Sequence, residues 1–122
     1  HLTVGDNEVA LLDMEAGVEH FGRGVDNSVD LILMIVDPSF ESLKLTKKIQ
    51  QLGESIGKTV FFVLNKVNEL VLPTMLESID DQSKVLAVIS TDTEIARKGL
   101  VGDELMMEIP EIHMLARKIL KQ

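Results

Sequence analysis

The 122-residue sequence predicts one α/β domain over residues 1–122, with a mostly parallel sheet and helices on both of its faces. Two observations predict this fold class. Four short apolar runs alternate along the chain with stretches of helical periodicity, as in consecutive β-α-β units. These runs are apolar at both odd and even positions, which is typical of parallel strands covered on both faces. The length fits a domain of ordinary size.

The four expected strands comprise residues 8–14, 30–37, 59–64 and 84–89. The second run reads D-L-I-L-M-I-V-D, with six consecutive apolar residues between two aspartates. The third reads T-V-F-F-V-L, and its β-branched and aromatic residues favour strand structure. No run approaches the roughly 18 apolar residues that a membrane-spanning helix needs.

Three helices are expected between and after these strands. Ser39 is the expected N-cap of the first helix, and Gly57 provides a C-terminal stop. The apolar positions between them recur at helical spacing and are Leu43, Ile49, Leu52 and Ile56. A short helix is expected over residues 73–79, which begin with proline. The last is expected over residues 110–121, where an early glutamate and late basic residues complement the helix dipole.

Charge and composition exclude several classes of function. Twelve basic and twenty acidic residues give a net charge of −8, so we expect neither a nucleic-acid partner nor an anionic membrane surface. The absence of cysteine excludes disulfides, thiolate zinc sites and cysteine nucleophiles from these residues. The same absence is compatible with a reducing, cytoplasmic location.

Polar residues follow every expected strand. In folds of this class, ligands bind at the carboxyl ends of the strands, which lie at one edge of the sheet. The polar segments that follow the four strands are residues 13–17, 37–39, 65–68 and 90–92. Four such segments at one edge predict a rim that binds a polar ligand.

Asp13 and Gly17 form the first candidate pair. An aspartate at the end of a buried strand can hold a water on Mg²⁺, as the second acidic motif of P-loop NTPases does. A glycine four residues later lets the loop approach a γ-phosphate with its backbone N–H. The alternative interpretation is that Asp13 caps a turn that Gly17 permits.

Asn65 and Lys66 form the second candidate pair. GTPases read guanine with N-K-x-D, but the fourth position here is Asn68, whose amide fits guanine poorly. The Asn65 amide can instead pair with adenine, which presents a donor and an acceptor side by side. The alternative is a solvated asparagine at a strand end.

Other candidates carry less specificity. Glu15, Glu19 and His20 form a weak metal-site candidate, because three scattered ligands without cysteine are common by chance. His113 lies among apolar residues of the last helix, and we interpret it as structural. We interpret the pair at residues 106–107, M-M, as core or interface residues rather than sulfur ligands.

No segment reads G-x-x-x-x-G-K-[ST]. The nearest is G-E-S-I-G-K-T at residues 53–59, which is one residue short and precedes a strand, so we interpret it as a helix end. A phosphate cradle needs backbone N–H groups at the start of a helix that follows a strand. We therefore expect this chain alone neither to bind ATP tightly nor to hydrolyse it.

The run D-M-E-A-G-V-E-H-F-G-R-G at residues 13–24 resembles the signature of the CooC-type accessory ATPases, which mature carbon monoxide dehydrogenase. These belong to the deviant-Walker group of MinD and the nitrogenase iron protein. The similarity continues through V-D-P-S at 36–39, F-V-L-N-K-V at 62–67 and I-S-T-D-T-E-I-A-R-K-G-L-V-G at 89–102. The chain thus resembles the C-terminal half of a P-loop NTPase, without the N-terminal half that carries the P-loop.

The resemblance implies roles for individual residues. Asp13 would be the acidic residue linked to Mg²⁺ through water, and Asp13 to Gly17 would form a catalytic switch. Asn65, with Lys66 beside it, would contact adenine. The segment Ser90, Thr91 and Asp92 would lie against the base, although Ser90 stands where relatives often carry proline.

The resemblance also implies cofactors and partners for a full-length protein. These are ATP and Mg²⁺, possible nickel, a homodimeric form, a carbon monoxide dehydrogenase-like client and a cytoplasmic location. The leading hypothesis is therefore a nucleotide-dependent maturation ATPase. The alternative is a non-catalytic α/β binding or scaffold module that has lost the phosphate site. A chromosome-partitioning relative is disfavoured by the net charge of −8.

Overall fold

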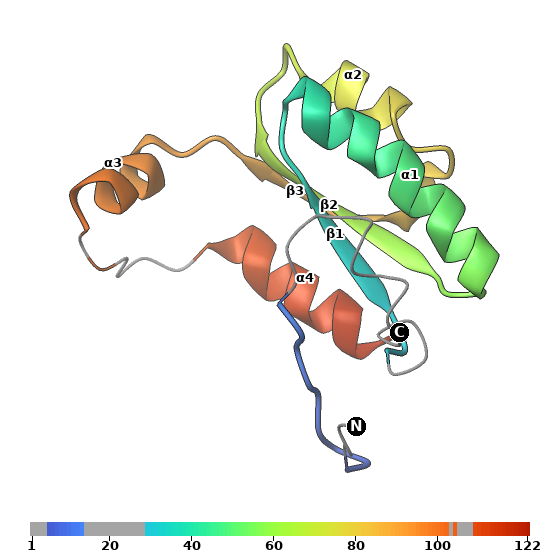
Figure 1. Ribbon diagram of the computed structural model, residues 1–122. Helices are drawn as coiled ribbons and strands as arrows, with labels where there is room; N and C mark the ends of the chain where they lie inside the picture. Colours follow the sequence, from blue (N-terminus) through green and yellow to red (C-terminus); the bar gives the residue numbers. More distant parts are fainter. Residues whose placement is uncertain (1–4, 14–28, 103, 105–108) are drawn as a thin grey trace.

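The computed structural model describes residues 5–13, 29–102, 104 and 109–122 (Figure 1). The elements run in the order β1 (Ile32–Val36), α1 (Phe40–Ile56), β2 (Val60–Val67), α2 (Leu72–Glu77), the 3-10 turn η2 (Gln82–Lys84), β3 (Val85–Ser90), α3 (Thr93–Val101) and α4 (Pro110–Leu120). The strands form a three-stranded parallel sheet in the order β1-β2-β3. The expected α/β class with a parallel sheet is confirmed.

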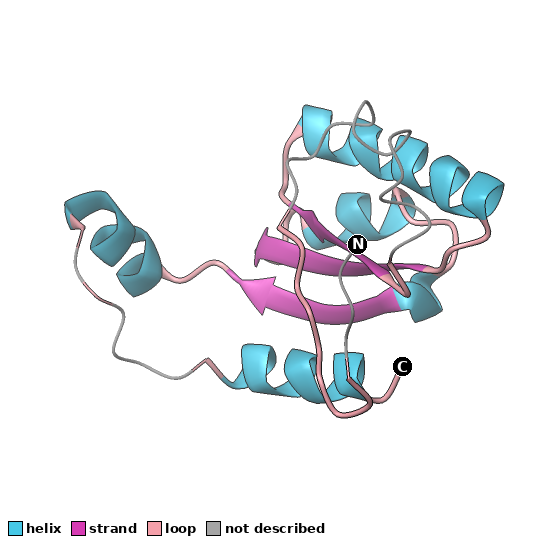
Figure 2. Ribbon diagram, turned by 60° about the horizontal axis from the view of Figure 1, so that its bottom comes forward, coloured by secondary structure: helices cyan, strands magenta, loops and turns pink. Residues whose placement is uncertain are grey.

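Helices lie on both faces of this sheet, as expected. Helices α1 and α2 cover one face and α4 lies under the other, while α3 projects beyond the sheet (Figures 1 and 2). The main core lies between the sheet and the first two helices. Its buried apolar residues are Met34, Val36, Ile49, Val60, Phe62, Leu64, Val67, Met75 and Ile79. On the opposite face, the Lys118 ammonium of α4 donates a hydrogen bond to the Leu86 carbonyl of β3 at 2.7 Å.

Helix α1 begins and ends where its sequence predicts. The Ser39 hydroxyl oxygen accepts a hydrogen bond from the Ser42 N–H at 3.2 Å and so satisfies one free donor of the first turn. Gly57 ends the helix in the left-handed conformation at φ 69°. Gly53 allows α1 to approach β2, because a Cβ at this position would lie 2.5 Å from Val60 Cγ2.

The first expected strand, residues 8–14, is wrong over the part that the structure describes. Residues 8–13 adopt no strand, and the apolar side chains Val9, Leu11 and Leu12 are exposed. A strand is stable only when a neighbour pairs with its N–H and C=O groups, and this segment has no place in the β1-β2-β3 ladder. Apolar composition alone therefore does not produce a strand here.

Burial on both faces holds for the central strand but not for β1. In β2, Phe61 and Val63 on one face of the sheet are buried, and so are Phe62 and Leu64 on the other face. In β1, Ile35 is 52% exposed, because α4 packs against β3. The uniformly apolar pattern thus overestimates how much of the second face the described residues cover.

Candidate functional site

The carboxyl ends of the three parallel strands bring polar residues to one edge of the sheet. Val36 of β1 pairs in register with Leu64 of β2, so the residues that follow them are neighbours. Val67 of β2 pairs with Ser90 of β3, and the Thr91 N–H donates to the Val67 carbonyl at 2.9 Å. This edge therefore carries three of the four polar segments that the sequence places there.

The Asp37 carboxylate is the centre of this edge. Its Oδ1 accepts a hydrogen bond from Asn65 Nδ2 at 3.2 Å. Its Oδ2 lies 3.6 Å from Lys66 Nζ. Both expected cofactor-binding residues of β2 therefore share one acidic partner. Asp37 opens segment 37–39 of the expected rim, but the sequence pattern assigned it no role of its own.

A bulge at the end of β2 positions the side chains of Asn65 and Lys66 at the edge of the sheet. The ladder between β2 and β3 shifts register between Leu64 and Val67, and Lys66 adopts a left-handed φ of 55°. Such a bulge adds an unpaired residue and re-aims side chains. Strand β2 consequently ends at Val67 and not at residue 64 as expected. The conformation of Lys66 is unfavourable for a residue with a Cβ, so tertiary contacts must maintain it.

The end of β3 and the two residues after it are divided between this edge and a helix. Ser90 and Thr91 are exposed. Asp92 is the N-cap of α3, and its Oδ1 accepts from the N–H groups of Glu94 at 2.8 Å and Ile95 at 3.2 Å. Helix α3 was not among the expected helices, although aspartate before T-E-I-A is a capping signal.

Asn68 has a local structural role. Its Oδ1 accepts hydrogen bonds from the N–H groups of Leu70 at 2.9 Å and Val71 at 3.0 Å. This oxygen therefore stabilises the turn that leads into α2.

Several expected site residues lie elsewhere or outside the described residues. Asp13 is exposed and follows no strand. Gly17, Glu15, Glu19, His20 and residues 106–107 lie outside the described part of the chain. Within the described ranges, no three acidic or histidine side chains are grouped as metal ligands. His113, interpreted as structural, is exposed on α4.

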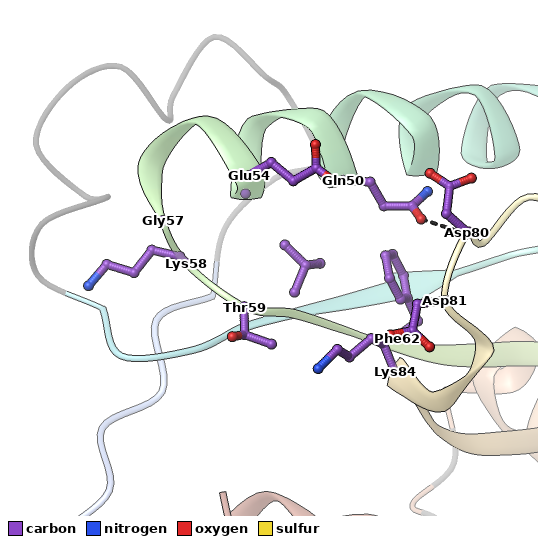
Figure 3. A pocket seen from close by; sticks show the side chains of 11 residues that line it. Gln50, Glu54, Gly57, Lys58, Thr59, Phe62, Asp80, Asp81 and Lys84 are labelled. Atoms are coloured by element: carbon purple, nitrogen blue, oxygen red, sulfur yellow. Dashed lines mark hydrogen bonds between the residues drawn. The ribbon is translucent and has the colours of Figure 1, made fainter.

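A hollow of about 380 Å³ lies at the opposite, amino end of the strands (Figure 3). The end of α1, the start of β2 and the turn before β3 form its walls. Gln50 fastens this region, since its Oε1 accepts from the Asp80 N–H at 2.8 Å and its Nε2 donates to the Ser78 carbonyl at 3.0 Å. Residues 53–59, the incomplete G-x-x-x-x-G-K-T match, lie here at a helix end as expected.

Comparison with known proteins relates the chain to ATP-binding proteins. It is 47% identical over 111 residues to an uncharacterized ATP-binding protein of Methanocaldococcus jannaschii, covering 91% of this chain and 44% of that protein. A second uncharacterized ATP-binding protein of that organism is 32% identical over 111 residues, covering 88% of this chain and 43% of the relative. No family model matches the sequence.

The resemblance to the CooC type is confirmed by a third relative. The carbon monoxide dehydrogenase accessory protein CooC of Rhodospirillum rubrum is 35% identical over 103 residues, covering 84% of this chain and 39% of that protein. The chain therefore fits the CooC-like ATP-binding proteins. It spans less than half the length of these curated relatives. None of the helices in the described ranges is both long and apolar enough to cross a membrane.

Proposed function

We propose that this chain supplies the base-recognition part of a nucleotide-dependent maturation ATPase of the CooC type. The observation that carries the proposal is the placement of Asn65 at the carboxyl edge of the sheet, with its amide nitrogen directed to Asp37 at 3.2 Å. The similarity to ATP-binding proteins over most of the chain supports it. In this proposal, the Asn65 amide recognises adenine.

The described residues fit the base better than the triphosphate. Asn65 offers an amide oxygen and a second N–H, which match the adjacent donor and acceptor of adenine. Ser90 ends the neighbouring strand β3, Thr91 and Asp92 follow it, and the three residues would form the adjoining wall. In contrast, the lysine-bearing glycine segment at residues 53–59 lies at the other end of the strands. The phosphates would therefore be held by residues outside the described part of the chain.

The remaining roles are proposals of the same kind. Asp13 would hold Mg²⁺ through a water, and Gly17 would belong to the same catalytic switch. ATP hydrolysis would drive a change in a cytoplasmic homodimer. The client would be a carbon monoxide dehydrogenase-like enzyme, and nickel would be the cargo. The CooC relative supports the choice of client.

Nucleotide binding by the complete gene product tests the base-recognition role. The change Asn65→Ala removes the amide and is expected to weaken ATP binding about tenfold or more, as for the loss of a paired polar group. Gln51→Ala is the matched control, because Gln51 is an exposed amide on α1. Calorimetry with Mg-ATP measures both. Unchanged affinity in Asn65→Ala would remove Asn65 from the base site.

The alternative of a non-catalytic binding or scaffold module makes a different prediction. A scaffold that has lost its phosphate site binds no nucleotide even as the complete gene product. Absence of both Mg-ATP binding and ATPase activity in that protein would favour this alternative. Nickel-dependent activation of a carbon monoxide dehydrogenase client, lost when ATP is omitted, would support the maturation role.

A further inference from the structure

We propose that Asp37 is a specificity-determining residue, which fixes the orientation of the Asn65 amide and thereby selects adenine over guanine. The proposal rests on the function proposed above and adds a residue to it. Asp37 would act as a positioning residue, through the contact between its carboxylate and the Asn65 amide. The end of the Asn65 amide that faces the carboxylate determines which hydrogen-bonding groups remain for the base.

A carboxylate decides the orientation of a neighbouring amide. An ionised aspartate only accepts hydrogen bonds, while the two ends of an asparagine amide are a donor and an acceptor. At a separation of 3.2 Å, Asp37 Oδ1 can therefore face only the amide nitrogen of Asn65. The amide oxygen then lies on the opposite side. Lys66 Nζ is closest to the other carboxylate oxygen, Oδ2, and leaves Oδ1 to Asn65.

The orientation of the amide distinguishes the two purines. On its Watson–Crick edge, adenine presents an exocyclic amino donor beside a ring-nitrogen acceptor. Guanine presents the reverse, an exocyclic carbonyl acceptor beside a ring N–H donor. An asparagine whose amide is free to rotate about the Cβ–Cγ bond can match either base, because the amide oxygen and the amide nitrogen have nearly the same shape. An asparagine held in one orientation matches only one.

Rotation of the Asn65 amide to suit guanine would be unfavourable here. It would turn Oδ1 toward the Asp37 carboxylate, break the hydrogen bond between Nδ2 and Oδ1 of Asp37 and place two acceptors against each other. Hydrogen bonds to charged groups are stronger than those between neutral groups. The loss of this bond therefore disfavours the rotated orientation of the amide. Asp37 therefore favours the orientation that recognises adenine.

The backbone on both sides holds the two residues in place. The Asp37 N–H donates to Ser42 Oγ at 3.0 Å, which fixes the turn between β1 and α1. Asn65 precedes Lys66, whose left-handed φ of 55° forms the bulge in β2. Both residues are partly buried at this edge of the sheet.

Base selectivity of the complete gene product tests the inference. We would measure the dissociation constants of ADP and GDP for the wild type, Asp37→Asn and Asp37→Ala by calorimetry. Asparagine at position 37 keeps the shape but can face either end of the Asn65 amide. In both variants, the preference for ADP over GDP, measured as the ratio of the two dissociation constants, is expected to fall about tenfold. Circular dichroism and urea unfolding would show that both variants fold.

The control variant is Asp80→Ala. Asp80 also pairs with a lysine, since its Oδ1 lies 2.8 Å from Lys47 Nζ, but it lines the hollow at the opposite end of the strands (Figure 3). It should keep the wild-type preference. If the wild type prefers ADP over GDP and the Asp37 variants keep the same preference, this inference is overturned while the proposed function stands. A wild type that binds neither nucleotide would overturn both this inference and the proposed function.

Discussion

Lys66 reaches the Asp37 carboxylate, with Nζ 3.6 Å from Oδ2, from a backbone conformation that disfavours any residue with a Cβ. The left-handed φ of 55° is the one positive φ among non-glycine residues in the described ranges. Two hydrogen bonds also lie at this edge of the sheet. Asn65 donates to Asp37, and the Thr91 N–H donates to the Val67 carbonyl. Local backbone strain therefore coincides with the candidate site, as is common at functional positions.

The strain at Lys66 predicts the order of stability of two variants. Lys66→Gly and Lys66→Ala both remove the ion pair, whose side chains are 65% and 45% exposed and which therefore contributes little. Only glycine adopts the left-handed conformation without a Cβ clash. We expect Lys66→Gly to be more stable than Lys66→Ala by about 1 kcal/mol in urea unfolding. Equal stability of the two variants would show that the bulge relaxes without Lys66.

The close approach of α1 to β2 predicts a destabilising glycine substitution. In Gly53→Ala, the new Cβ would lie 2.5 Å from Val60 Cγ2 and 3.0 Å from the Lys58 carbonyl oxygen. We expect a loss of about 1–3 kcal/mol in the free energy of unfolding, as for other overpacked sites.

A second helical glycine provides the control for Gly53→Ala. Gly99 lies within α3, and a Cβ there would meet no atom within 4 Å. Gly99→Ala is therefore expected to be neutral or to stabilise by about 0.5–1 kcal/mol, because alanine favours helix. Thermal or urea unfolding compares the two. A neutral Gly53→Ala would mean that α1 does not approach β2 this closely.

The cap of α3 predicts that Asp92 contributes to stability. Asp92→Ala removes the acceptor for the N–H groups of Glu94 and Ile95 and should lower the free energy of unfolding by about 1 kcal/mol. Asp92→Ser keeps a capping oxygen and should retain most of this stability. Nucleotide affinity measured on the same two variants separates capping from base contact. Affinity lost in both variants, with stability kept in Asp92→Ser, would indicate a direct contact of the carboxylate with the base.

Asp81 predicts a pH dependence of stability. The Ser83 hydroxyl and then the Ser83 backbone N–H donate to its carboxylate and lower the pKa of Asp81 below its ordinary value of 3.8. The folded state thus favours the ionised form more than the unfolded state does. The resulting stabilisation is fully present above pH 3.8 and is lost as the pH falls through the lower, folded pKa.

Unfolding of Asp81→Ala across the acidic range measures this contribution. The stability difference between wild type and Asp81→Ala should be larger at neutral pH than well below pH 3.8. Ser83→Ala removes the hydroxyl donor and should reduce the pH dependence while leaving the backbone donor in place. A difference that stays constant with pH would contradict the lowered pKa of Asp81.

Much of the fold is determined by signals within a few residues. The cap at Ser39, the left-handed stop at Gly57 and the proline at the start of α4 define helix ends through local hydrogen bonds and backbone preferences. The apolar runs define β1, β2 and β3 to within a few residues. The candidate residues Asn65 and Lys66 were predicted because they follow one of these runs.

Other features depend on the tertiary structure. Residues 8–13 have the composition of a strand but no place in the described sheet, and Ile35 is exposed because α4 lies against β3. The contact between Asp37 and Asn65 joins residues 28 apart in sequence. It depends on the register of β1 against β2 and on the bulge at Lys66, which no local sequence pattern specifies. The sequence therefore determined which strand ends carry polar residues, while the pairing of the strands decided which of these residues meet.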